Sequence, residues 1–402
     1  MKRRNCIVVV LALTAVAAGL RLSAATYHVD CRNGSDANDG LSAGSSFKTL
    51  KKATSMLKAG DVLELAPGAK FHESLVMASS GTPQAPIVIH GNGAVLSGLA
   101  PVPDDSWKEM DGGLWLSANK VKSGALMPRV VDRDGVWRSV SCFSPSKVKP
   151  ESLKPGESIW KDEGIWFRPE KGRRPQDYGL QGFYRESGFK VDGKSYVTVE
   201  NLVCEHFAND GFNVHGSCAG LVFRNVVGRY NGDDGFSVHE DVQANVYGGS
   251  FHHNDYGIQD ISASQSSFCG VTVVSNRLHG VDLLGGLRVI RDSVVRDNSS
   301  GQIRIRGDVA PHMGWDRGNP LFRSRAYLEH VVAGPGDGAA LAVWKDAGVT
   351  TANCEFSGTD FGVDVSGDGI LHLVKTKIHE CKKGSVRRSR DSDVVVKECD
   401  IK

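Results

Sequence analysis

The sequence predicts an all-β chain folded as a right-handed parallel β-helix, and the main indication is a repeat in its second half. Asparagines recur at intervals of 23, 22 and 22 residues, at Asn231, Asn254, Asn276 and Asn298. Glycines recur at nearly the same interval, at Gly211, Gly235, Gly257, Gly280 and Gly301. Asn and Gly tolerate the left-handed backbone of tight turns, and stacked asparagines can hydrogen-bond to the coils above and below. A propeller would need blades of about 40 residues, so that alternative is set aside.

Apolar and polar residues alternate after these glycines. In one repeat, Phe236 and Val238 are apolar, whereas Ser237 and His239 are polar. The apolar pair recurs along the chain as Phe212 and Val214, Val281 and Leu283, Ile303 and Ile305, Leu341 and Val343, and Val363 and Val365. Because successive side chains of a strand point to opposite faces, the apolar residues should fill the coil and the polar residues should line its outside.

The first 25 residues have the pattern of a secretory signal peptide. Three basic residues, Lys2, Arg3 and Arg4, precede an apolar run over residues 6–20, and small residues follow up to Ala25. This order predicts cleavage after Ala25 and a secreted or periplasmic protein. The apolar run is too short to favour a membrane span, and none is expected elsewhere.

Three further parts follow the predicted signal peptide. Residues 26–99 should form an N-terminal cap and the first coils, with a short amphipathic helix over residues 48–58 covering the open end. Residues 100–189 break the repeat and hold five of the seven tryptophans. We expect an inserted β-rich subdomain there, whose tryptophans either form its core or stack on sugar rings. Residues 190–402 should form the regular coils.

The overall composition argues against several classes of function. The formal net charge is +2 and the charged residues are scattered, so no nucleic-acid-binding face is expected. Eight of the nine cysteines would remain after signal-peptide cleavage, and they could form disulfides or stay free within strands. None has the C-x-x-C spacing of a structural zinc site. We expect a monomer.

The beginning of the predicted mature chain carries three short motifs, Tyr27–Asp30, Asn33–Gly40 and Phe47–Leu50. They resemble the N-terminal segment of pectate-lyase-like right-handed β-helix proteins, and together with the coils the likeness covers most of the mature chain. The resemblance implies a secreted protein that acts on a polysaccharide as a lyase, hydrolase or epimerase, or that binds it as an adhesin. It does not name the reaction, because function depends on the site and not on the fold.

Two families offer a closer comparison. Residues 234–240 resemble the Y-G-F-D-P-H-E motif of mannuronan C5-epimerases, but Ser237 stands where that family has its catalytic aspartate. This departure argues against epimerase activity by the family's route. Polygalacturonases carry N-T-D, D-D, G-H-G and R-I-K motifs, and similar pairs occur here in the same order, as Asn209-Asp210, Asp233-Asp234, His279-Gly280 and Arg304-Ile305-Arg306. The histidine falls about one coil late, and Arg306 replaces the lysine.

Coils about 4.8 Å apart would stack the outward residues into columns. The first predicted column is Asn213, Ser237, Gln259, Asp282 and Arg304. The second is His215, His239, then Asp260 or Ile261, Leu284 and Arg306. The alternation would place Asp260 inside the coil, so it is either a buried acid with a local partner or an acid that a bulge turns outward. Any solvated sheet carries polar columns, but the mixture of His, Asp and Arg favours a functional groove.

The first hypothesis for this groove is a lyase that cleaves an acidic polysaccharide. The uronate carboxylate must be neutralised before the neighbouring proton is abstracted, and Arg304 and Arg306 could do this. Calcium could do the same, and its expected ligands are Asp233, Asp234 and Asp241. His239 would act as the base, with Asp282 or Asp260 orienting it or donating a proton. Substrate contacts are expected from Asn213, His215, Gln259, Arg306 and Lys345.

Two alternatives remain open. A glycoside hydrolase would need two carboxyl groups flanking the scissile bond. The candidates are Asp210, Asp233, Asp234, Asp260 and Asp282. A non-catalytic protein would use the same columns only to bind sugar.

Overall fold

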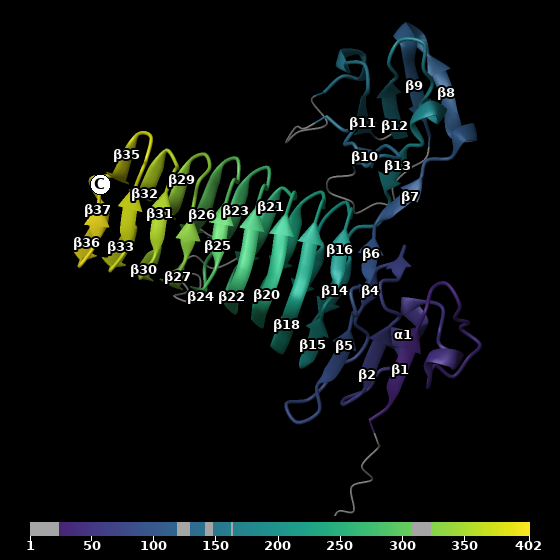
Figure 1. Ribbon diagram of the computed structural model, residues 1–402, viewed down its shortest axis with the longest axis horizontal. Helices are drawn as coiled ribbons and strands as arrows, with labels where there is room; N and C mark the ends of the chain where they lie inside the picture. Colours follow the sequence, from purple (N-terminus) through teal and green to yellow (C-terminus); the bar gives the residue numbers. More distant parts are fainter. Residues whose placement is uncertain (1–23, 119–128, 141–147, 162–163, 308–322) are drawn as a thin grey trace, which may run out of the picture.

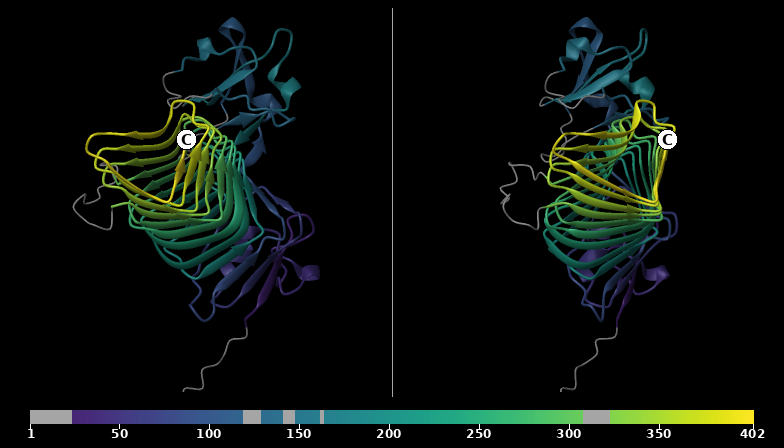
Figure 2. Two further views of the ribbon diagram at one scale, coloured as in Figure 1. Left: turned by 60° about the vertical axis from the view of Figure 1, so that its left-hand side comes forward. Right: turned by 90° about the vertical axis from the view of Figure 1, so that its left-hand side faces the viewer.

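The computed structural model describes residues 24–118, 129–140, 148–161, 164–307 and 323–402. Over these residues the chain forms a right-handed parallel β-helix of about 13 turns, which confirms the predicted fold class. Figure 1 shows the coils lying side by side along the long axis of the molecule. Figure 2 shows, from the C-terminal end, that successive coils lie over one another. The predicted signal peptide lies outside the described residues apart from Ala24 and Ala25, and no described helix is long and apolar enough to cross a membrane.

A ten-stranded parallel sheet forms one face of the solenoid. Its strands are β4 (Leu75–Val76), β14 (Phe189–Asp192), β17 (Phe212–His215), β19 (Asp234–Val238), β21 (Tyr256–Ile261), β23 (His279–Leu284), β26 (Gly301–Arg306), β29 (Ala339–Trp344), β32 (Phe361–Ser366) and β35 (Gly384–Arg388). Phe212, Phe236, Ile258 and Val281 pair in register along this sheet and are buried. The inward placement of the apolar residues is therefore confirmed, while the polar residues that alternate with them, such as Ser237 and Asp282, are also buried.

The remaining faces of the coils form a twenty-stranded sheet. Its strands are β1 (Thr26–Val29), β2 (Val62–Leu65), β3 (Lys70–Phe71), β5 (Ile87–His90), β6 (Val95–Ser97), β15 (Val197–Glu200), β16 (Val203–Glu205), β18 (Ser217–Arg229), β20 (Asp241–His252), β22 (Gln265–Val274), β24 (Leu287–Arg291), β25 (Val294–Arg296), β27 (Arg325–Glu329), β28 (Val332–Ala333), β30 (Gly348–Ala352), β31 (Glu355–Ser357), β33 (Ile370–Val374), β34 (Lys377–His379), β36 (Asp393–Lys397) and β37 (Asp400–Ile401). Helix α1 (Leu50–Met56) lies at the N-terminal end, where a capping helix was predicted, and the Thr49 side chain caps it by accepting a hydrogen bond from the backbone N–H of Lys52.

Between residues 100 and 188 the chain leaves the solenoid and forms antiparallel sheets. One sheet contains β8 (Trp107–Met110), β9 (Leu114–Ser117), β12 (Gly164–Arg168) and β11 (Glu157–Lys161), and the other contains β7 (Leu99–Pro101), β13 (Gln181–Phe183) and β10 (Val130–Val131). Trp107 is buried in one of three small hydrophobic clusters of this segment. The other four tryptophans are partly buried against these clusters, and they are Trp115, Trp137, Trp160 and Trp166. Their packing corresponds to the core role that the sequence left open. We call residues 100–188 the insert (Figure 1).

An asparagine ladder runs through the turns of the central coils. The backbone N–H of Asn231 donates to Oδ1 of Asn254 at 2.9 Å, and Asn254 donates in the same way to Asn276 at 3.0 Å. Asn276 continues the series to Asn298 at 3.0 Å, and all four asparagines are buried. This is the stacked hydrogen bonding that their spacing predicted.

Four of the five recurring glycines, Gly211, Gly235, Gly257 and Gly280, are needed for a different reason from the one the sequence suggested. Gly235 and Gly257 do not have a positive φ, and a Cβ on either would come within 2.7 Å of the ladder asparagine amide nitrogen of the next coil. The left-handed residue is the one before each ladder asparagine, such as Tyr230 with φ 56° and His253 with φ 58°. The glycines therefore make room for the ladder.

Asp260 points into the coil, in register with Val238 and Leu283. The Asp260 carboxylate and the Arg288 side chain are 0% and 1% exposed, and Nε of Arg288 lies 2.7 Å from Oδ2 of Asp260. Arg288 also donates to the backbone oxygens of Ser264 and Gly285. Asp260 is thus the buried acid with a local partner, and it does not line the cleft described below.

Replacing Arg288 with Met should lower the free energy of unfolding by about 3–5 kcal/mol, because the Asp260 carboxylate would stay buried without a counter-charge. The double variant Asp260→Leu/Arg288→Met should regain most of that loss, since no buried charge remains. Urea unfolding of both variants measures the difference. Equal destabilisation of the two would contradict this account of the pair.

Candidate functional site

The predicted first column exists as a register across five strands. Asn213 pairs with Ser237, Ser237 with Gln259, Gln259 with Asp282, and Asp282 with Arg304. The parallel sheet therefore brings together side chains that are up to 91 residues apart in the sequence. Each of these residues lies beside its partner on the next strand, about 4.8 Å away along the solenoid.

A third column, which the sequence analysis did not assemble, runs beside the first. Asp234 pairs with Tyr256, and the Tyr256 ring stacks on His279 with centroids 6.2 Å apart. Asp210 lies one coil before Asp234, and its Oδ1 accepts a hydrogen bond from the backbone N–H of Asp234 at 3.3 Å. The signal was present in the sequence, because all four residues directly precede a glycine of the repeat.

A cleft of about 570 Å³ opens on the ten-stranded sheet over β14, β17, β19 and β21. Its lining includes acids from the turns before β17 and β19 and histidines from the ends of these strands. The predicted substrate residues Asn213, His215 and Gln259 also line it. Lys345 does not, because it lies exposed in the turn after β29.

Three aspartates form a cluster at the cleft. One carboxylate oxygen from each of Asp210, Asp233 and Asp234 lies within 4.8 Å of the other two, and Asp210 and Asp234 are each 1% exposed. The amides of Asn209 and Asn213 both donate to Oδ2 of Asp210, the first at 2.8 Å. We call Asp210, Asp233 and Asp234 the acidic cluster.

Burial raises the pKa of all three acids. For Asp233, burial and then the charge of Asp255 raise the pKa to about 6, against the opposing charges of Arg129 and Arg277. The pKa values of Asp210 and Asp234 are raised well above their usual range by burial and then by the neighbouring aspartates. Carboxylates this close cannot all ionise without a compensating positive charge. The acidic cluster is therefore either partly protonated or able to bind a cation.

The donor atoms of the acidic cluster fit a hard cation such as calcium. All of them are oxygens, which calcium prefers. Oδ1 of Asn209 and Oδ1 of Asp234 are buried and have no hydrogen-bond partner among the described residues, so both could serve as ligands. The predicted set needs one correction. Asp241 is exposed at the start of β20, beside Ser217 on the other sheet, and Asp210 takes its place.

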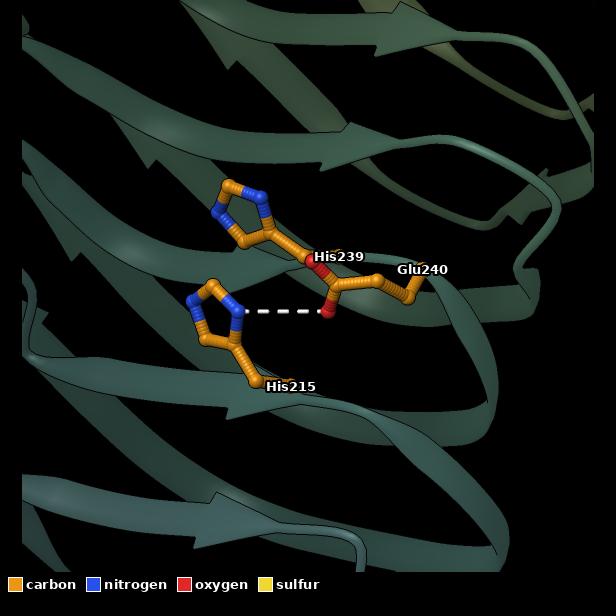
Figure 3. Close-up of side chains that lie close together, drawn as sticks. All are labelled: His215, His239 and Glu240. Carbon is orange, nitrogen blue, oxygen red and sulfur yellow. Dashed lines mark ion pairs between the residues drawn. The ribbon is translucent and has the colours of Figure 1, made fainter. Parts of the chain in front are cut away.

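Two histidines stack at the ends of β17 and β19 (Figure 3). The rings of His215 and His239 have centroids 4.1 Å apart and an interplanar angle of 11°. Nδ1 of His215 lies 3.2 Å from a carboxylate oxygen of Glu240, and Nε2 of His239 lies 3.0 Å from Oγ of Ser237. Burial and then the neighbouring His215 lower the pKa of His239 to about 3, so this ring is neutral at neutral pH.

Two arginines share one carboxylate beyond this cleft. Arg304 binds Asp282 through two hydrogen bonds of 2.7 and 2.8 Å, and Arg306 adds a third of 2.8 Å. Burial alone would raise the pKa of Asp282, but the arginine hydrogen bonds and charges outweigh it and the pKa is lowered. Asp282 is therefore an ionised anchor for the arginines and a poor proton donor. Together, Arg304, Arg306 and the ionised Asp282 carry a net positive charge.

The insert contacts the coils next to the acidic cluster. Arg129 of the insert lies 3.4 Å from the Asp255 carboxylate, which also binds Arg277, and Trp137 of the insert lies over the Arg277 guanidinium. The backbone N–H of Asp255 donates to the backbone oxygen of Asp233 at 2.7 Å. The insert thus places positive charge beside Asp233. No pattern in the sequence indicates this contact, because it joins residues 126 positions apart.

The fold and this groove define a right-handed parallel β-helix protein with an acidic cleft on one face. Residues 187–308 match the family model described as right handed beta helix region. No curated protein matches the chain.

The seven cysteines that the structure describes are all free, so none of them forms a disulfide.

Several solved structures share the fold. The xylose complex of XylC is 11% identical, with 93% of this chain and 86% of that chain covered and a TM-score of 0.54. Pectate lyase Pel9A is 13% identical, with 94% and 79% covered and a TM-score of 0.54. A glycoside hydrolase is 13% identical, with 94% and 96% covered and a TM-score of 0.50. At these identities the likeness concerns the fold alone.

The raised pKa values predict that the cation-free protein loses stability as the pH rises. Unfolded aspartates ionise near pH 4, whereas Asp233 holds its proton until about pH 6, so the folded state is penalised across that interval. With a chelator present, the melting temperature of the protein should fall as the pH rises through this interval. Added calcium should restore the melting temperature at neutral pH.

Asp234→Asn should flatten this pH dependence, and the matched variant Asp241→Asn should leave it unchanged, because Asp241 lies outside the acidic cluster. Differential scanning fluorimetry measures both effects. Identical profiles for the two variants would contradict the assignment of the acidic cluster.

Proposed function

We propose that the chain is an exported polysaccharide lyase that cleaves a uronic-acid polymer by β-elimination in the cleft over β14, β17, β19 and β21. The main support is the acidic cluster, which faces the same cleft as two histidines. Calcium bound to Asp210, Asp233 and Asp234 would neutralise the substrate carboxylate beside the reacting carbon. The shared fold with pectate lyase Pel9A agrees with a polysaccharide substrate.

His215 is the residue we assign as the base. Glu240 lies against Nδ1 and orients the ring, which leaves Nε2 as the nitrogen that accepts a proton. His239, which the sequence suggested for this role, has a pKa near 3 and takes up a proton poorly. We therefore assign His239 to support the His215 ring through stacking.

The reaction needs only one proton acceptor from the chain. His215 takes the proton from the carbon that carries the uronate carboxylate, and the electron pair forms a carbon–carbon double bond. The bond from the adjacent carbon to the glycosidic oxygen breaks, and that oxygen takes a proton from water. Arg304 and Arg306, with one positive charge in excess over Asp282, would bind a second carboxylate of the polymer further along the sheet.

A retaining glycoside hydrolase is the second candidate. Asp233, whose pKa is raised to about 6, would keep its proton in mildly acidic solution and could act there as a general acid. One carboxylate oxygen of each acid lies within 4.8 Å of the others. Carboxyl groups in such contact are nearer the roughly 5–5.5 Å of a retaining pair than the roughly 6.5–9.5 Å of an inverting pair. A hydrolase would not need calcium, and this distinguishes the two candidates.

Incubation with pectate and alginate should produce unsaturated sugar ends that absorb in the ultraviolet, and EDTA should abolish this signal until calcium is restored. New reducing ends without the absorbance, in the presence of EDTA, would favour the hydrolase. Binding of the polymer without either product would indicate a non-catalytic polysaccharide-binding protein.

His215→Ala should lower kcat by roughly a hundred-fold or more, which is the contribution of a positioned base. Lys345→Ala is the matched control, since Lys345 lies outside the cleft, and it should keep the turnover of the parent protein. Initial rates on the cleaved polymer measure both. Unchanged turnover in His215→Ala, with an unchanged melting temperature, would remove His215 from the mechanism.

A further inference from the structure

The histidine pair and Glu240 form a second group of potential metal ligands, separate from the acidic cluster. His215 ends β17, while His239 and Glu240 come directly after β19, so the parallel register places them on adjacent coils. One donor atom from each residue lies within 4.8 Å of the others. Figure 3 shows the two rings over one another, with the Glu240 carboxylate beside them.

The donor atoms are held and available. The Glu240 carboxylate accepts a hydrogen bond from the backbone N–H of Gly216 at 2.9 Å, and Ser237 lies 3.0 Å from Nε2 of His239. Such outer hydrogen bonds orient the ligands in known metal sites. Nδ1 of His239 is buried and has no hydrogen-bond partner in the part of the chain that the structure describes. The neutral ring keeps its lone pair, which a metal needs.

We propose that His215, His239 and Glu240 bind one divalent transition-metal ion, of which zinc is the best match. Two imidazoles and one carboxylate suit zinc, whereas calcium prefers oxygen ligands only. Three protein ligands leave the fourth position of a tetrahedral ion open, and here it would face the cleft, since all three residues line it.

Binding requires a small local change. Donor atoms that bind one tetrahedral zinc ion at about 2.0–2.1 Å lie roughly 3.4 Å from one another. In the present structure the three donor atoms lie up to 4.8 Å apart. The two rings are also stacked, so their in-plane nitrogen lone pairs run parallel and do not point at a common ion. One ring must therefore rotate. The side chain of His215 is 35% exposed and can do so, whereas His239 is more deeply buried.

The metal site goes beyond the proposed lyase activity, and the binding itself does not rest on it. If His215 is the base, zinc and the substrate proton compete for the same imidazole. Zinc should then inhibit cleavage without displacing calcium. The two proposals are thus separable by measuring zinc binding in the absence of any substrate.

The test is titration of the whole exported chain with Zn²⁺ by calorimetry in buffer saturated with calcium, with Co²⁺ absorption spectra to report histidine ligation. One site is expected, and His215→Ala and His239→Ala should each weaken it by at least about ten-fold, the loss that even an outer partner causes. His372→Ala, at an exposed histidine on β33, is the matched control and should bind as the parent does. Melting temperatures verify that each variant folds.

Zinc binding that survives in both histidine variants would overturn the proposal. Loss of zinc binding in Asp234→Asn would also overturn it, because the ion would then lie in the acidic cluster. Intact zinc binding together with absent lyase activity would support the metal site while rejecting the proposed function.

Discussion

The hydrogen bonds that join each ladder asparagine to the next coil fix the vertical register of the solenoid. Each coil repeats after about two dozen residues, and the hydrogen bonds to Asn254 and Asn276 hold successive turns directly over one another. Gly235 and Gly257 serve this ladder, because a side chain at either would collide with an asparagine amide. Once the turns are aligned, the strands between them must pair in parallel and their outward residues must form columns.

The columns concentrate charge in a way that no single coil could. The acidic cluster gathers three carboxyl groups from two adjacent turns, and burial followed by the charges of neighbouring aspartates raises their pKa values. Along the same sheet, Arg304 and Arg306 converge on Asp282 and leave one positive charge in excess. A polymer with regularly spaced carboxylates matches such a surface, since a bound cation and the arginines would each meet one of its charges.

The insert modifies this groove from outside the solenoid. Arg129 brings a positive charge to Asp255, and Asp255 is joined to Asp233 through the backbone. Arg277 also binds the Asp255 carboxylate, and its guanidinium lies over the Trp137 ring. The insert therefore helps to set the ionisation of one member of the acidic cluster, although its own tryptophans serve mainly as core.

The amino-acid sequence by itself determined the solenoid, because the repeat, the alternation and the ladder asparagines are all local and periodic. It also determined the first outward column, since a constant period fixes which residues stack. Only the tertiary structure decided which acids meet. Asp241 was a natural third ligand by sequence proximity, but it begins a strand on another sheet, and Asp210 from the preceding coil replaces it. Asp260 faces inward to Arg288, a partner from a different sheet that no periodic pattern reveals, because such pairings depend on how the coil closes.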